Sequence, residues 1–230
     1  LLSIMKPFLT IAEARTADGA NLSLHERDGH YFLRLNNQPL MGTSETESET
    51  VLAERACARL KGDQPVRVLI GGLGFGFSLK RVLSRLGPPA VVQVAELLPE
   101  VVAWNREYLR ELNGALLDDP RVQVSIADVF QLIYRAPNGH YDAILLDVDN
   151  GPIAMVHGGN ARLYQSRGLA AIMRALKPGG RVAFWSANQD TVFAKRLTLA
   201  GFTVNIVAAK AHPHARREAH TIFVADRKKV

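Results

Sequence analysis

Acidic residues follow three apolar segments of the chain, and each acid is a candidate for chemistry. Glu96 ends AVVQVAE, Asp128 follows VQVSIA, and Asp147 and Asp149 follow YDAILL. At the carboxyl end of a parallel strand, a carboxylate can accept hydrogen bonds from ribose hydroxyls or an adenine amino group. Two close carboxylates can bind a cationic amine, and their repulsion raises one pKa so that it can take the amine's proton. The acids therefore predict a site for a nucleoside and an amine.

The same acids also have structural interpretations that the sequence leaves open. Glu96 fits a surface acid before the helix that starts at Pro99, and Asp128 fits the N-cap of a helix in VFQLIY. Asp147 and Asp149 fit an acidic turn that ends at Gly151. We favour the functional interpretation for Glu96 and for the Asp147 pair, and for Asp128 both roles are compatible.

A glycine-rich turn precedes the first of these acids. VLIGGLGFG places Gly72, Gly74 and Gly76 after a strand and before a helix, where glycine allows a tight turn and the close approach of a ligand. The GxGxG spacing differs from the dinucleotide fingerprint GxGxxG, and the Lys-Ser/Thr of a phosphate-binding P-loop is missing. Read alone, the turn fits a nucleotide site or a purely structural connection.

These residues need a parallel sheet to bring them together, and the chain predicts one. From residue 66 on, apolar strands alternate with amphipathic helices, and the last two strands form an antiparallel pair. The expected fold is α/β, with a Rossmann-like seven-stranded sheet that has one antiparallel strand. A turn is expected at Pro178-Gly179-Gly180. Residues 1–45 form a small N-terminal β-element with a hairpin at Asp28-Gly29, and 46–230 form the main domain.

Composition and charge narrow the function further. The chain has 230 residues, 47% hydrophobic content and one cysteine, Cys57, which excludes a disulfide scaffold and a cysteine-based metal cluster. No membrane-spanning run or signal peptide is found, so a cytoplasmic protein is expected. Residues 151–230 hold 13 lysines and arginines against three acids, but no interleaved aromatics, so nucleic acid is the less favoured partner. The histidines at 212, 214 and 220 resemble a metal cluster but are interpreted as surface-loop residues, and Trp185, which could border the substrate pocket, is interpreted as a core residue.

Several motifs resemble the spermidine synthase (polyamine aminopropyltransferase) group within the S-adenosylmethionine-dependent methyltransferase fold. They are VLIGGLGFG, VAELLPEVVAWNREYL, DDPRVQVSIADVF, YDAILLDVDNGP and LYQSRGLAAIMRALKPGGRVAFWSA. The resemblance implies a Rossmann-like methyltransferase sheet, a small-molecule amine substrate, a homodimer and no metal. The cofactor would be decarboxylated S-adenosylmethionine or S-adenosylmethionine, held by Gly72, Gly74, Glu96, Leu97, Asp128, Val129 and Pro152. Asp147 would be the catalytic base, and Asp149 and Tyr164 would contact the substrate.

The chain departs from the family pattern where the family binds the polyamine. The family carries two acids three residues apart, whereas Asp147 and Asp149 are two apart, and Asn36-Asn37 replaces the family's Asp-Gly. Gln38 and Glu49 are candidates to replace missing N-terminal groups, and the acidic run at 45, 47 and 49 suits a polycation. Aminopropyl transfer is therefore the preferred function. A methyltransferase and a non-catalytic relative of the fold are the alternatives.

Overall fold

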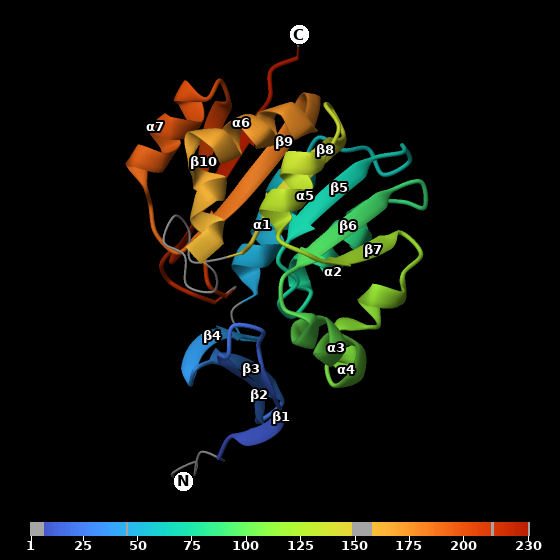
Figure 1. Cartoon of the computed structure of the whole chain (residues 1–230), viewed down its shortest axis with the longest axis vertical. Helices are drawn as coiled ribbons and strands as arrows, with labels where there is room; N and C mark the ends of the chain where they lie inside the picture. Colours follow the sequence, from blue (N-terminus) through green and yellow to red (C-terminus); the bar gives the residue numbers. More distant parts are fainter. Residues whose placement is uncertain (1–6, 45, 149–157, 213, 230) are drawn as a thin grey trace.

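A seven-stranded sheet forms the centre of the molecule in the computed structural model (Figure 1), which describes residues 7–44, 46–148, 158–212 and 214–229. The strand order is β10-β11-β9-β8-β5-β6-β7, and β11 runs antiparallel to both of its neighbours while the other pairs are parallel. The strands are β5 (Arg67–Gly71), β6 (Val91–Glu96), β7 (Val122–Ile126), β8 (Tyr141–Leu146), β9 (Leu176–Ser186), β10 (Thr203–Ala209) and β11 (His220–Asp226). The predicted α/β sheet with one reversed strand is confirmed.

Both faces of the central strands are apolar because helices cover both faces. In β5, Val68 and Ile70 belong to one buried cluster and Leu69 to the other, as the alternation of side chains along a strand requires. The first cluster contains side chains of α1 (Glu47–Cys57), α2 (Phe77–Arg85) and α3 (Pro99–Glu107), followed in the chain by the short α4 (Arg110–Asn113) and η1 (Leu116–Asp118). The second contains side chains of η2 (Gly158–Tyr164), α5 (Val129–Arg135), α6 (Ser166–Ala175) and α7 (Thr191–Leu199).

A second, four-stranded antiparallel sheet precedes α1 and lies at the other end of the molecule from the C-terminus (Figure 1). It consists of β1 (Leu9–Arg15), β2 (Asn21–Arg27), β3 (His30–Leu35) and β4 (Gln38–Gly42). Asp28 and Gly29 have positive φ and join β2 to β3, which confirms the predicted hairpin. Asn36 and Asn37 also have positive φ, 48° and 64°, and turn the chain into β4, a strand that the sequence analysis missed.

One predicted turn is wrong. The chain passes through Pro178-Gly179-Gly180 as part of β9, which begins at Leu176 and has a register shift opposite Tyr141 and Ala143. Gly179 accommodates the irregularity with a φ of +79°. Within the described parts of the chain, every helix is too short or too polar to cross a bilayer.

Candidate active site

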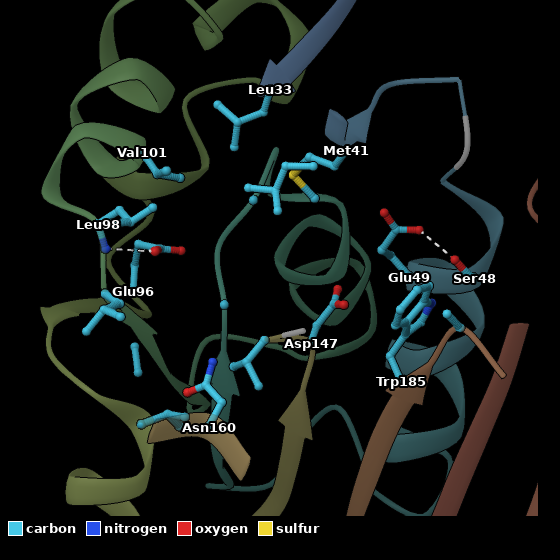
Figure 2. A pocket seen from close by; sticks show the side chains of 18 of the residues that line it. Leu33, Met41, Ser48, Glu49, Glu96, Leu98, Val101, Asp147, Asn160 and Trp185 are labelled. Carbon is cyan, nitrogen blue, oxygen red and sulfur yellow. Dashed lines mark hydrogen bonds between the residues drawn. The ribbon is translucent and has the colours of Figure 1, made fainter. Parts of the chain in front are cut away.

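A cavity of about 300 Å³ lies where the carboxyl ends of β5, β6 and β8 meet the small sheet and α1. Figure 2 shows its walls, with Glu96 on one side, Asp147, Glu49 and Trp185 on the other, and Met41 between them. Seven of the predicted site residues line it: Gly72, Gly74, Glu96, Leu97, Asp128, Val129 and Asp147. The topology of the parallel sheet brings them together, because it places the carboxyl ends of neighbouring strands along one edge.

The glycine-rich turn after β5 forms the floor between the two sides. Gly72 has a φ of +90° and its amide donates a hydrogen bond to the carbonyl of Ala95 (2.9 Å). A Cβ at Gly72 would collide with the main-chain carbonyl oxygen of Asp147. At Gly74, with a φ of +52°, a Cβ would stand 2.7 Å from Cε of Met41. Gly72 therefore requires glycine, and at Gly74 a side chain would need the end of Met41 to move. The turn comes close to Asp147 on one side and to the small sheet on the other.

Two buried asparagines hold this turn, and the sequence analysis missed both. The Nδ2 of Asn105 donates hydrogen bonds to the carbonyls of Gly74 and Val101, each at 2.8 Å. Its Oδ1 accepts a hydrogen bond from Nδ2 of Asn113 at 2.7 Å. Because both side chains are only 2% exposed, these bonds fix the position of the Gly74 carbonyl from behind the cavity. Asn105 lies in α3 and Asn113 in α4.

Glu96 is a buried carboxylate held by main-chain amides. Its Oε2 accepts a hydrogen bond from the Leu73 amide (2.8 Å), and its Oε1 accepts one from the Leu98 amide (2.9 Å). Burial raises the pKa of Glu96, and these amide hydrogen bonds lower it in part. The carboxylate lines the cavity, and a carboxylate can make a bidentate contact with two vicinal hydroxyls.

Asp128 is the N-cap of α5, one of the two roles that the sequence allows, and it also lines the cavity. Its Oδ1 accepts a hydrogen bond from the Phe130 amide (2.8 Å). Its Oδ2 forms an ion pair with Nη2 of Arg162 (2.8 Å), whose guanidinium lies 4.7 Å from the centre of the Phe130 ring. The sequence analysis did not identify Arg162. This ion pair joins η2 to the wall of the cavity that contains Asp128.

Asp147 follows β8 and faces the cavity as the predicted base. Burial raises the pKa of its carboxyl to about 6, and a long hydrogen bond from Oγ of Ser78 (3.4 Å) opposes this shift. A carboxyl with this pKa is ionised at neutral pH yet basic enough to take up a proton. The other acid on this side is Glu49 of α1, which accepts a hydrogen bond from Oγ of Ser48 (2.9 Å; Figure 2).

Aromatic side chains complete the side of the cavity that holds Asp147. Trp185, near the end of β9, lines the cavity and also packs against the hydrophobic core, so both interpretations that the sequence allowed apply to it. Its ring lies 4.8 Å, centroid to centroid, from that of His220, which also lines the cavity and is not a surface residue. The strand ends alone did not reveal this pair, because it depends on the antiparallel pairing of Trp185 with Ile222 on β11.

Three other predicted site residues are not brought to this cavity by the described structure. Asp149 and Pro152 lie outside the described residues. Tyr164 is 2% exposed, and its ring packs against those of Phe184 and Phe193 in the core. Among the described residues, no three side chains of the metal-binding types come together.

The charges on the cavity wall favour a cationic ligand. Four acids line it, at positions 49, 96, 128 and 147, of which Asp128 is paired with Arg162, and the described lining itself includes no lysine or arginine. Glu96 and Asp128 stand with apolar residues on one side, as hydroxyl and amino groups of a nucleoside would require. Asp147 and Glu49 stand on the other side with the indole ring of Trp185, an arrangement that can bind an ammonium group through charge and cation–π attraction (Figure 2).

Comparisons with known proteins agree with this geometry. A family model described as the spermine/spermidine synthase domain matches residues 51–199. A polyamine aminopropyltransferase of Mycobacterium tuberculosis is 38% identical over 115 residues, 49% of this chain and 21% of that protein. A spermine synthase of Arabidopsis thaliana is 34% identical over 116 residues, 50% of this chain and 30% of that protein. The matched segments thus span less than a third of these relatives.

Solved structures show the same fold. A spermidine synthase in complex with the transition-state analogue AdoDATO aligns with a TM-score of 0.77 and 19% identity, over 96% of this chain and 74% of that chain. The spermidine synthase of Thermotoga maritima aligns with a TM-score of 0.74 and 18% identity, over the same shares of the two chains. Because the family model covers more than half of the sequence, the chain belongs to the spermine/spermidine synthase family.

Proposed function

We propose that this protein transfers an aminopropyl group from decarboxylated S-adenosylmethionine to an amine. The observation that carries the proposal is the placement of Asp147, whose pKa is raised to about 6, between the glycine-rich turn and a second acid, Glu49. Such a site holds a nucleoside and a cationic amine side by side. Membership of the spermine/spermidine synthase family supports the same reaction.

The nucleoside would be bound by residues that already have the required chemistry. Glu96 accepts hydrogen bonds from the two ribose hydroxyls, and Asp128 accepts one from the adenine amino group while the Val129 amide faces a ring nitrogen. Leu97 and Leu98 provide apolar contact with the ribose and the base. Gly72 and Gly74 line the cavity without side chains, so the chain that carries the sulfonium can lie against their main chain.

Asp147 would act on the amine. An amine that enters as an ammonium group has no lone pair, so Asp147 first accepts one proton from it. The nitrogen then attacks the methylene carbon next to the sulfonium, the N–C bond forms, and the C–S bond breaks. Its electron pair stays on sulfur, which leaves as the neutral thioether of methylthioadenosine. Because the sulfonium is already a good leaving group, positioning and this proton transfer supply most of the catalysis.

The charges of the site favour this donor over S-adenosylmethionine. The methionine carboxylate of S-adenosylmethionine would lie near Asp147 and Glu49, and the described cavity wall offers it no lysine or arginine. The decarboxylated form replaces that carboxylate with hydrogen and keeps the ammonium group, which the acids attract. The same argument makes a small polycationic amine the expected acceptor.

The test is a reaction of the full chain with each donor. With decarboxylated S-adenosylmethionine and 1,3-diaminopropane, putrescine or spermidine, we expect methylthioadenosine and an amine lengthened by one aminopropyl group, both measured by mass spectrometry. Asp147→Asn should slow this reaction at least a hundredfold. Formation of S-adenosylhomocysteine from S-adenosylmethionine, with no product from the decarboxylated donor, would establish methyl transfer instead.

A further inference from the structure

A second cavity, of about 360 Å³, opens at the amino ends of the parallel strands. Its walls come from the residues at the starts of β5, β6, β8 and β9, so it lies at the edge of the sheet that faces away from the small sheet (Figure 1). The active-site cavity lies at the opposite edge, and no residue lines both. The second cavity is therefore a separate site.

Four nitrogen-bearing side chains line this second cavity: Arg67, Asn138, His140 and Lys177. Arg67 begins β5, His140 directly precedes β8, and Lys177 is the second residue of β9. Lys177 is neutralised, because its Nζ contacts both oxygens of Asp142 at 2.8 and 2.9 Å. Asp142 is further occupied by the main-chain amide of Arg67 (2.8 Å).

The guanidinium of Arg67 keeps its positive charge uncompensated. No acid forms an ion pair with it in the part of the chain that the structure describes, since Asp142 accepts only its main-chain amide. The nearby positive charge also affects His140. Burial, together with the charges of Arg67 and Lys177, lowers the pKa of its imidazole. Its ring also packs edge-on against Tyr141, with the centroids 4.7 Å apart. At neutral pH the cavity thus carries a net positive charge.

The remaining wall consists of Gly139 and four apolar residues, Pro65, Val66, Pro89 and Val91. We propose that this cavity binds a small organic phosphate, whose phosphoryl oxygens pair with Arg67, the cation that Asp142 does not neutralise, and whose carbon part lies against the prolines and valines. A guanidinium presents parallel N–H groups that match two oxygens of one phosphoryl group. The side chains of Asn138 and His140 line the same cavity.

Nuclear magnetic resonance of the histidines tests this site in the full chain. The probes are inorganic phosphate and phenyl phosphate, added at constant ionic strength with chloride as the reference. A bound dianion counteracts the positive charge of Arg67 beside His140, so the pKa of His140 should rise by at least half a unit. Phenyl phosphate should bind at least threefold more tightly than inorganic phosphate, because it adds apolar contact without adding charge.

Arg67→Gln is the informative variant, with Arg106→Gln as its matched control. Glutamine at 67 keeps the main-chain amide that Asp142 needs, and Arg106 is an exposed arginine on α3, away from this cavity. Phosphate affinity should fall at least tenfold in Arg67→Gln and stay unchanged in Arg106→Gln. His30, on the small sheet, serves as the internal reference that both variants are folded. A His140 pKa that ignores phosphate in the unaltered protein, or that still responds fully in Arg67→Gln, would overturn the proposal.

Discussion

The main chains of Gly72 and Asp147 are in direct contact, so the glycine-rich turn and the proposed catalytic base form one rigid unit. A Cβ on Gly72 would collide with the carbonyl oxygen of Asp147, and the Asp147 amide donates a hydrogen bond to the carbonyl of Gly71 (2.9 Å). Neither group can move without the other. Transfer between two bound molecules depends on such fixed geometry, since a displacement of about 1 Å can cost roughly a hundredfold in rate.

Gly72→Ala should therefore separate backbone strain from steric collision. Gly72 and Gly29 have similar φ values, +90° and +80°, but a Cβ at Gly29 meets nothing within 4 Å. Gly29→Ala should lower the free energy of unfolding by about 1–2 kcal/mol, the cost of a left-handed alanine. Gly72→Ala adds the collision and should lower it by roughly 2–5 kcal/mol.

Denaturant unfolding measures both variants, and calorimetry with methylthioadenosine measures binding. Gly72→Ala should bind the nucleoside at least tenfold more weakly, whereas Gly29→Ala should bind it normally. Equal losses of stability in the two variants, together with normal binding in both, would show that the contact between Gly72 and Asp147 is unimportant.

Glu96→Gln should weaken nucleoside binding through the ribose. In Glu96, the amides of Leu73 and Leu98 donate to different carboxylate oxygens, but a glutamine has only one acceptor oxygen. Its NH₂ group, a donor, would therefore face either another donor amide or a ribose hydroxyl that needs an acceptor. A mismatched buried polar group costs about 1–3 kcal/mol, which corresponds to a loss of affinity of about tenfold or more.

Calorimetry with two ligands identifies the ribose as the group concerned. Methylthioadenosine should bind Glu96→Gln at least tenfold more weakly than it binds the unaltered protein. Its 2′,3′-dideoxy analogue, which lacks both hydroxyls, should bind the two proteins with similar affinity. An equal loss for both ligands would place Glu96 in a purely structural role.

The pH dependence of turnover should reveal Asp147. With a pKa of about 6, its carboxyl becomes protonated as the pH falls, and kcat should fall with it through an apparent pKa near 6. Asp147→Asn cannot accept the proton, so it should lose this limb and most of its rate while keeping its affinity for methylthioadenosine. Steady-state kinetics from pH 5 to 9 check both points, and an unchanged acid limb in Asp147→Asn would assign the base to another group.

Glu49→Gln should affect the amine and spare the nucleoside. Glu49 lines the cavity on the side of Asp147. Glu47, two residues earlier in the same helix α1, does not line it. The loss of one acid near a bound ammonium should raise KM for the amine about tenfold, and Glu47→Gln should leave it unchanged. Kinetics with varied amine at saturating donor measure the effect. A higher KM for the donor instead would place Glu49 on the nucleoside side.

The sequence predicted the part of the site that depends on strand ends. Glu96, Asp128 and Asp147 follow strands that pair in parallel, and parallel pairing brings their carboxyl ends to one edge whatever the helices do. The glycine-rich turn was identified for the same reason, because it connects β5 to α2 at that edge.

The parts that depend on packing between distant segments were missed or misread. Met41 reaches Gly74 only because Asn36 and Asn37 turn the chain into β4. Both adopt positive φ values, which asparagine tolerates better than most residues do. Trp185 and His220 meet through antiparallel strands whose register no local pattern specifies. The ion pair between Arg162 and Asp128 likewise joins segments that are 34 residues apart.

Asp147→Asn should also stabilise the protein at neutral pH, because the raised pKa means that the fold disfavours the ionised carboxyl. The folded-state pKa is about 6 against an ordinary value of 3.8, so the folded state binds more protons between these two values. Stability of the unaltered protein should therefore fall as the pH rises from about 4 to 6 through this group, by at most about 3 kcal/mol. Asparagine has no such titration.

The free energy of unfolding of Asp147→Asn should match that of the unaltered protein near pH 4 and exceed it at pH 7.5, as urea unfolding at both pH values will measure. A constant difference between the two proteins across this range would contradict the burial of Asp147 as a charged group.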